Sequence, residues 1–340
     1  MAPVLFRHPS SHDHETGAHP ERVERIEAIE AALEPRDWLG WDVRESPPVQ
    51  RSVLEAVHPS DYVQRIESIS LRGGGALDMD TVLSSGSWEC VLHSTGGTVA
   101  MVDVLLGGEA RFGASAHRPP GHHAERSRGM GFCLFNHVAV AAQHALDAHG
   151  AGRILIVDFD VHHGNGTNDT FHETDAVLFC SIHQSPLYPG TGPASDVGSG
   201  AGTGYTVNMP VPPGSGDEVF CSLLEHVVVP LGREYKPALI LVSAGYDAHR
   251  SDPLGSCTCT ADGFGAMTAS VRRLAEGLDV PAGLVLEGGY DLDGLATSLV
   301  ASLEALGADE TPAADPGLEV HPLAAAATER LAGRWPALAP

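Results

Sequence analysis

Acidic and imidazole side chains follow an apolar, strand-like run in the middle of the chain. The run 154–157 leads directly into Asp158, Asp160 and His162, which alternate with apolar residues. Because side chains alternate across a strand, a strand that continues through this segment would place all three polar groups on one face. Burying two carboxylates beside an imidazole is costly unless a cation or a hydrogen-bond network compensates them, and the stretch 154–170 contains no Lys or Arg. The pattern therefore favours a bound cation.

A second apolar run, 238–242, is followed shortly by Asp247. Ligands of open α/β sheets bind beyond the carboxyl ends of the strands, so Asp160, His162 and Asp247 are expected to converge there. Three protein ligands that leave one coordination position open are typical of a catalytic divalent ion. Two carboxylates and one imidazole without a thiolate suit a single Zn²⁺ and would also accept Fe²⁺ or Co²⁺. Asp158 would then orient a neighbouring side chain.

Two adjacent histidines, His122 and His123, follow the turn-forming sequence Pro-Pro-Gly at 119–121. Histidine pairs on loops are often only solvated, but beside a metal site they would supply a general base. Asp158 and Asn165, which are left over from the ligand set, would each orient one imidazole through its other ring nitrogen.

A third apolar run, 282–286, ends in Glu287 and two glycines followed by Tyr290. This order predicts a phenol on a flexible turn at the same sheet edge. A tyrosine that merely packs against a loop is the alternative interpretation.

The rest of the chain alternates between apolar runs and amphipathic stretches, as in a parallel α/β sheet with helices on both faces. No long linker interrupts the alternation, so we expect a single domain over 1–340 with a motif-bearing core at 19–306 and a peripheral segment at 307–340. Thr260 is expected to cap one helix, and Gly150 to end another. The expected strands are 153–157, 176–179, 238–242 and 282–286, and the expected helices are 21–33, 136–149, 217–234, 261–277 and 292–306.

The charge balance is strongly acidic, with 20 Lys and Arg against 44 Asp and Glu and a formal net charge of −24. Nucleic acids and anionic membranes require clustered positive charge, so both are disfavoured as partners. Neither a signal peptide nor an apolar run of membrane-spanning length is recognisable, which predicts a cytoplasmic protein. The sequence is compatible with a homo-oligomer.

Taken together, the polar segments resemble the histone deacetylase superfamily, which also includes acetylpolyamine amidohydrolases and acetoin-utilisation proteins. Asn165 resembles the class II and bacterial pattern, because class I enzymes have an aspartate there. The matching segments run in family order and are HPER at 19–22, RPPGHHA at 118–124, GFCLFN at 131–136, DFDVHHGNGT at 158–167, YPGTG at 188–192, GYDAH at 245–249 and EGGY at 287–290.

The resemblance implies an arginase–deacetylase fold, with a mostly parallel sheet of about eight strands covered on both faces. It also implies metal-dependent amide hydrolysis, with Asp160, His162 and Asp247 as zinc ligands. His123 would be the general base and then the general acid, and His122 would act mainly electrostatically.

By the same resemblance, Asp158 is the partner of His122 and Asn165 that of His123, and Tyr290 hydrogen-bonds the scissile carbonyl. An amide at position 165 is expected to make His123 less basic than a carboxylate would.

The resemblance further implies a narrow acyl-lysine channel lined by the aromatic pair Phe132 and Tyr188, with Gly131, Leu254 and Gly289 also in contact with substrate. A structural K⁺ would bind backbone oxygens near Asp158, Asp160 and His162, together with the Ser181 hydroxyl and the Ile182 carbonyl. A weaker match to a second K⁺ site lies around Phe171, Thr174, Val177 and Tyr205.

Two substrates share this chemistry, namely the N-acetyllysine side chain of a protein or peptide and an acetylated polyamine. In the polyamine-preferring vertebrate relative a glutamate stands at the position of Leu254, so Leu254 favours acetyllysine. A metal-free binding module is a remote alternative, and a ureohydrolase would need further aspartates for a second metal. We interpret the N-terminal histidines as a loop at the rim of the site; they are His8, His12, His14 and His19.

Overall fold

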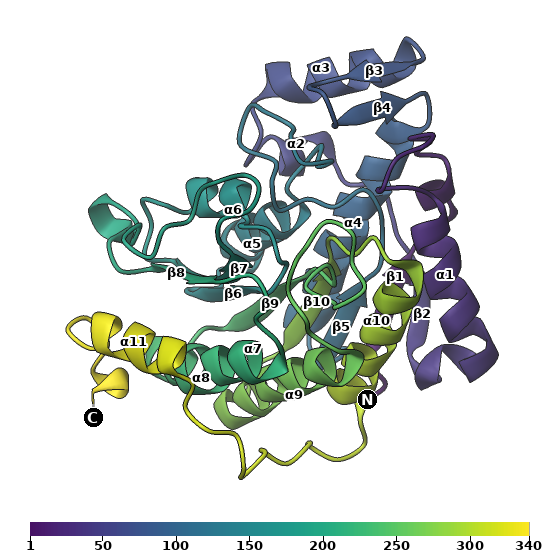
Figure 1. Ribbon diagram of the computed structural model, residues 1–340. Helices are drawn as coiled ribbons and strands as arrows, with labels where there is room; N and C mark the ends of the chain where they lie inside the picture. The colour runs from purple at the N-terminus through teal and green to yellow at the C-terminus, as the bar shows by residue number, and fades with distance from the viewer. Residues whose placement is uncertain (340) are drawn as a thin grey trace.

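One eight-stranded sheet forms the centre of the computed structural model, which describes residues 1–339 (Figure 1). All its strand pairs are parallel, in the order β2-β1-β5-β10-β9-β6-β7-β8, which confirms the predicted α/β class. The strands are β1 Val4–Arg7, β2 Asp42–Glu45, β5 Phe112–Ser115, β6 Ile154–Asp158, β7 Val177–Gln184, β8 Thr206–Val211, β9 Leu239–Ala244 and β10 Ala282–Leu286. A separate antiparallel pair consists of β3 Gly74–Ala76 and β4 Val82–Ser84.

Helices cover both faces of the sheet, because its strands are apolar on both sides. Leu155 and Val157 of β6 belong to a core shared with α1 and α7 to α11, whereas Ile154 and Ile156 face a second core shared with α2 to α5. The helices are α1 Glu24–Leu33, α2 Arg51–Leu54, α3 Ser60–Leu71, α4 Ser87–Leu106, α5 His137–His149, α6 Asn165–Thr170, α7 Asp217–Leu223, α8 Val229–Tyr235, α9 Ala261–Leu278, α10 Leu292–Gly307 and α11 Pro322–Leu331.

Helix ends follow the capping signals in the sequence. The side chain of Asn136 accepts a hydrogen bond from the Ala139 amide at the start of α5, and Gly150 ends that helix in the left-handed conformation. Thr260 caps α9 by accepting from the Gly263 amide, as expected. The helix expected at 217–234 is instead α7 and α8 joined by a π-helical turn, Leu224–Val228.

The chain beyond α10 crosses the molecule in an extended segment before α11 packs against α7 (Figure 1). None of the helices within residues 1–339 combines the length and apolar character that a membrane crossing needs.

Candidate active site

The segment after β6 leaves the sheet earlier than the alternating pattern predicted. β6 ends at Asp158, so Asp160 and His162 lie in an irregular loop, and the expectation of one strand face carrying all three was wrong. The reason is local hydrogen bonding. The Asp158 carboxylate accepts from the Asp160 amide at 3.1 Å, and the Asp160 carboxylate accepts from the His162 amide at 2.9 Å. These side chains take the amide hydrogens that a continuing strand would donate to its neighbours.

The loop nevertheless brings Asp160, His162 and Asp247 together in a buried group, with ligand atoms that all lie within 4.8 Å of one another. His162 Nδ1 lies 3.1 Å from Asp160 Oδ1 and 3.2 Å from Asp247 Oδ2. Burial disfavours a charged ring, but the two carboxylates raise the pKa of His162 to about 10. A single imidazolium balances only one of two buried carboxylates, so this donor set fits a divalent cation.

Glycine backbone encloses the carboxylates of the site. A side chain at Gly245 would overlap the carboxylate of Asp160, and one at Gly288 would overlap that of Asp247. The Gly288 amide donates to Asp160 Oδ2 at 2.9 Å. The space around these oxygens is therefore limited by main chain rather than by movable side chains.

The two adjacent histidines differ in their electrostatic environments. His122 Nδ1 lies 3.0 Å from Asp158 Oδ2, and although burial lowers its pKa, Asp160 and Asp158 raise it well above the usual value. The pKa of His123 is held well below its usual value by burial and by its neighbours His122 and His162. The environment thus favours a cationic His122 beside a neutral His123.

His123 is oriented by an amide that is itself oriented by an acid. His123 Nδ1 lies 2.8 Å from Asn165 Oδ1, and Asn165 Nδ2 donates to Glu125 Oε1 at 3.0 Å. The contact with Glu125 fixes which end of the amide faces the ring. Sequence reasoning did not single out Glu125, although it directly follows the HHA motif.

A cavity of about 190 Å³ is lined by His123 and by His162 of the metal group. It is lined by four of the five residues expected to contact substrate, namely Gly131, Phe132, Tyr188 and Leu254. Gly289 is not among the lining residues. Besides the two histidines, the remaining lining residues are Tyr290, Leu187 and Asp80, and the last two were not expected.

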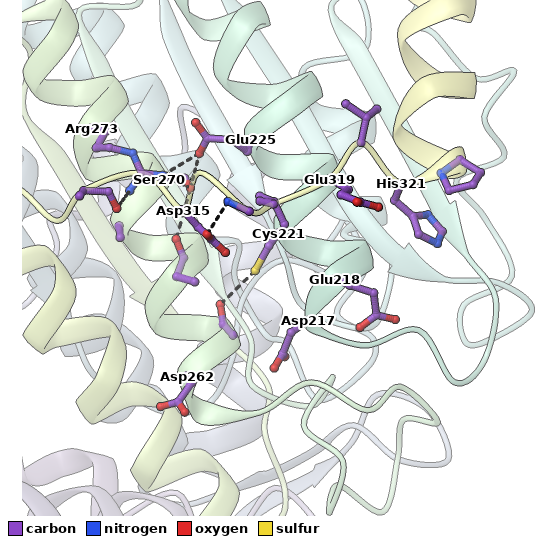
Figure 2. Close-up of a pocket in the computed structure, with 18 residues that line it drawn as sticks. Asp217, Glu218, Cys221, Glu225, Asp262, Ser270, Arg273, Asp315, Glu319 and His321 are labelled. Atoms are coloured by element: carbon purple, nitrogen blue, oxygen red, sulfur yellow. Dashed lines mark hydrogen bonds and ion pairs between the residues drawn. The ribbon is translucent and has the colours of Figure 1, made fainter.

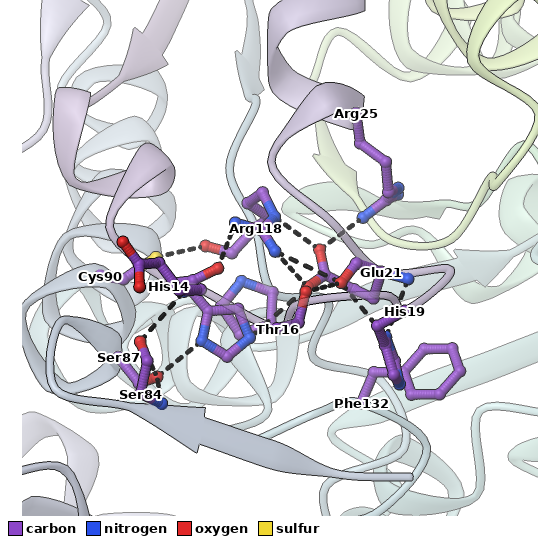
Figure 3. Close-up of polar contacts among 12 residues, drawn as sticks. His14, Thr16, His19, Glu21, Arg25, Ser84, Ser87, Cys90, Arg118 and Phe132 are labelled. Carbon is purple, nitrogen blue, oxygen red and sulfur yellow. Dashed lines mark hydrogen bonds and ion pairs between the residues drawn. The ribbon is translucent and has the colours of Figure 1, made fainter. Parts of the chain in front are cut away.

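Tyr290 sits against a buried guanidinium that the sequence did not reveal. The Arg25 guanidinium lies 5.0 Å from the centre of the Tyr290 ring, and its Nε donates to the Gly289 carbonyl at 2.7 Å. Arg25 also contacts Glu21, which pairs with Arg118 (Figure 3). Glu21 belongs to the HPER motif at 19–22, but nothing in the sequence indicated a role for it.

Glu287 connects the loop of Tyr290 to the histidine pair. Its Oε2 accepts from the amides of Gly121 and His122 at 2.6 and 3.0 Å, and Oε1 accepts from the Ser243 hydroxyl. Burial raises the pKa of Glu287 to about 7. The carboxyl thus anchors the main chain on which His122 and His123 are carried.

The residues expected at the first potassium site lie at the sheet edge that carries the metal group, whereas those of the second lie at the opposite edge, near the start of β7. Asp158 pairs with Ser181 in the β6–β7 register, and the Ser181 hydroxyl lies 2.9 Å from His183 Nδ1. Ile182 follows in β7 and is buried. The second group surrounds the start of β7 and consists of Phe171, Thr174, Val177 and Tyr205.

The N-terminal histidines do not form one rim. His19 meets Phe132 edge-on at 4.6 Å and is beside the cavity, as expected. His14 is buried against Ser87 and Glu21, and His8 stacks on His93. The expectation was therefore wrong for His14, because its ring lies inside the polar network of Glu21. His8 and His12 do not line the cavity either, since their rings contact His93 and Glu30.

A separate cavity of about 710 Å³ contains none of the expected site residues. It lies between α7, α9 and the segment 313–322, and several carboxylates surround it (Figure 2).

Known proteins resemble this chain over most of its length. The histone deacetylase domain matches residues 19–306. The chain is 37% identical over 339 residues to "Histone deacetylase 14, chloroplastic" of Arabidopsis thaliana, and the alignment covers 92% of this chain and 79% of that protein. It is 40% identical over 235 residues to the "Histone deacetylase-like amidohydrolase" of Pseudomonas aeruginosa, and this alignment covers 69% of this chain and 62% of that protein.

The crystal structure of the HDA15 HD domain superimposes with a TM-score of 0.91 at 34% identity, covering 99% of this chain and 96% of that one. The eight-stranded sheet is thus that of the arginase–deacetylase fold. A domain match over most of the chain, together with relatives named as deacetylases, assigns the activity class of a hydrolase. The chain belongs to the histone deacetylase family.

Proposed function

We propose that this protein is a zinc-dependent amidohydrolase that removes acetyl groups from N-acetyllysine side chains of proteins or peptides. The observation that carries the proposal is the cavity whose lining includes His162 of the metal group, His123 and Tyr290. Phe132 and Tyr188 make its walls apolar and aromatic, which suits the methylene chain of an acylated lysine.

Asp160, His162 and Asp247 would hold the metal ion. When bound, Zn²⁺ would polarise the amide carbonyl and lower the pKa of a water ligand from about 15.7 to roughly 7. Fe²⁺ or Co²⁺ would suit the same ligands.

His123 would move the protons of the reaction. Its Nδ1 faces the Asn165 oxygen, so Nδ1 carries the ring hydrogen and Nε2 offers a lone pair. A low pKa keeps this lone pair free at neutral pH, and Nε2 takes the proton of the attacking water. The same nitrogen then gives that proton to the departing amine.

His122, held cationic by Asp158 and Asp160, would stabilise negative charge that develops beside it. Tyr290 would donate its phenolic hydrogen to the oxyanion. Burial raises the pKa of this phenol well above its usual value, so the hydrogen is present over the whole neutral range. Arg25 holds the ring and the preceding carbonyl in place.

Acetylated polyamines form a second candidate class, because acids surround the mouth of the channel. Asp80 lines the channel and also a neighbouring cavity of about 400 Å³, which Asp78, Glu125 and Arg128 share. A distal ammonium group would be attracted there. Leu254, which lines the channel without a charge, favours acetyllysine instead.

The test is a comparison of kcat/KM on an acetyllysine peptide and on acetylputrescine or acetylspermidine, with the zinc-loaded protein. We expect a higher value on the peptide. A strong preference for the polyamines would overturn the choice of substrate, and no hydrolysis of either would overturn the function.

The other expectations from the sequence extend this proposal. Ser181, Ile182 and main-chain oxygens around Asp158, Asp160 and His162 would bind a structural K⁺. We further propose that the sheet, its two cores and α11 form a single domain. Cytoplasmic location and a homo-oligomeric state stay predictions.

A further inference from the structure

Two imidazoles and a carboxylate converge where α4 packs against α5 (Figure 1), on elements that carry none of the residues lining the channel. Nε2 of His144 and Nε2 of His149 each lie 2.7 Å from the same atom, Oδ1 of Asp103. The ligand atoms of the three residues lie within 4.8 Å of one another, and the two rings meet nearly edge to face with centroids 5.5 Å apart.

We propose that Asp103, His144 and His149 form a second metal site, which binds a divalent transition-metal ion such as Zn²⁺ and joins α4 to α5. Two imidazole nitrogens and one carboxylate oxygen are a donor set that Zn²⁺ accepts, and protein sites with three ligands complete their coordination with water. The Asp103 side chain is half exposed, so solvent reaches the open position.

The two rings meet at Asp103 although their positions do not share one face of α5. His149 lies five positions after His144, and on a regular helix this spacing places the side chains about 140° apart, not on one face. α5 ends at His149, because Gly150 adopts the left-handed conformation. Asp103 lies near the end of α4, and its Oδ1 contacts Nε2 of both rings.

The geometry requires only small side-chain movements to admit an ion. With bonds of about 2.0–2.2 Å, tetrahedral ligands lie about 3.3–3.5 Å apart, so each imidazole would withdraw by less than about 1 Å from Asp103. All three side chains are at least partly exposed and have room to do so.

Two convergent imidazoles distinguish this group from an ordinary surface pair. His172 Nε2 lies 2.8 Å from Asp196 Oδ1 with a comparable exposure, but only one imidazole is present in that pair. His172 therefore serves as a matched control. The chain's net charge of −24 also raises the local concentration of cations at such a site.

The first experiment counts zinc. Chelator-treated protein is equilibrated with Zn²⁺, and bound zinc per chain is measured by mass spectrometry. We expect two ions for the wild type and for His172→Ala, and one for His144→Ala and for His149→Ala, which keep their deacetylase activity. A count that is the same in all four proteins would overturn the proposal.

A second measurement needs no variant. Diethyl pyrocarbonate modifies imidazole nitrogens that carry a free lone pair, and peptide mass spectrometry reports the rate at each histidine. We expect Zn²⁺ to slow modification of His144 and His149 at least tenfold and to leave His172 unchanged. Equal rates at His144 and His149 with and without Zn²⁺ would overturn the site independently of any result at the catalytic group.

Discussion

The guanidinium of Arg118 binds both carboxylate oxygens of Glu21, a residue 97 positions earlier in the chain, and both side chains are fully buried. The two contacts measure 2.8 and 2.7 Å, and Arg25 donates to the same carboxylate at 3.1 Å (Figure 3). Burial raises the pKa of Glu21, but Arg118 and the other neighbours lower it to about 2. The N-terminal segment is thereby tied to the loops of both His122 and Tyr290.

Removing Glu21 should strongly destabilise the protein, because two buried guanidinium groups would lose their counter-charge. We expect Glu21→Ala to lower the free energy of unfolding by about 3–5 kcal/mol. Urea denaturation measures the change. The control is Arg51→Ala, which removes exposed contacts with Glu55 and Glu67 and should cost less than about 1 kcal/mol. Equal losses in the two variants would contradict the importance of burial.

Tyr290→Phe tests the oxyanion donor alone. The ring and its contact with Arg25 stay, while the hydroxyl hydrogen is lost. Loss of one such donor typically costs about 2.7–4 kcal/mol, so we expect turnover to fall by ~10²–10³. Zinc content should match the wild type. Unchanged turnover would remove Tyr290 from the mechanism.

Asp247→Ala tests the metal group. With one of three ligands gone, we expect zinc at the catalytic group and deacetylase activity to be lost together. Asp262→Ala, at an exposed carboxylate of the separate cavity, serves as the control and should change neither quantity. Full occupancy of the catalytic group in Asp247→Ala would refute its role as a ligand.

Leu254→Glu tests the choice of substrate. A carboxylate at the channel would attract a distal ammonium, so the ratio of kcat/KM for acetylspermidine over an acetyllysine peptide should rise roughly tenfold, equivalent to about 1.4 kcal/mol. Leu254→Gln has a similar length but no charge and should leave the ratio near that of the wild type. An equal rise in both variants would show that shape, not charge, is responsible.

His58 makes folding stability dependent on pH. Its Nε2 accepts a hydrogen bond from the Asn136 amide, and its Nδ1 lies 3.1 Å from the Arg126 carbonyl, so the buried ring must be neutral. Burial lowers its pKa from 6.5 to about 4. A lowered histidine pKa gives stability that is full above pH 6.5 and is lost as pH falls toward 4.

At pH 5 this loss amounts to about 2 kcal/mol for the single group, because one pKa unit corresponds to about 1.36 kcal/mol. Urea denaturation at pH 7 and pH 5 should show that the wild type loses more stability than His58→Gln, which cannot titrate. The same loss in both proteins would assign the pH dependence to other groups.

The sequence predicted the parts of this structure that local chemistry controls. Apolar runs located four strands of the central sheet, and Thr260 and Gly150 marked helix ends, because each signal acts within a few residues. The convergence of Asp160, His162 and Asp247 followed from the rule that strand ends share one edge of a parallel sheet.

One local feature was not predicted: the end of β6 depends on carboxylates that accept hydrogen bonds from amides two residues later, a competition that the alternation of side chains does not reveal.

Contacts between distant segments were not predictable from local signals at all. No spacing rule pairs Glu21 with Arg118, and none brings His144 and His149 of α5 to Asp103 of α4. These arrangements depend on tertiary packing.

The glycines beside the metal group affect how such a protein can diversify. Gly245 and Gly288 leave no room for even a methyl group next to Asp160 and Asp247, so a saturation library should recover almost no functional alleles there. Leu254 and Leu187 face the channel without such a constraint. Evolution can therefore change which acylated substrates enter the channel while the residues around the metal group stay the same. Directed evolution should randomise only the channel positions.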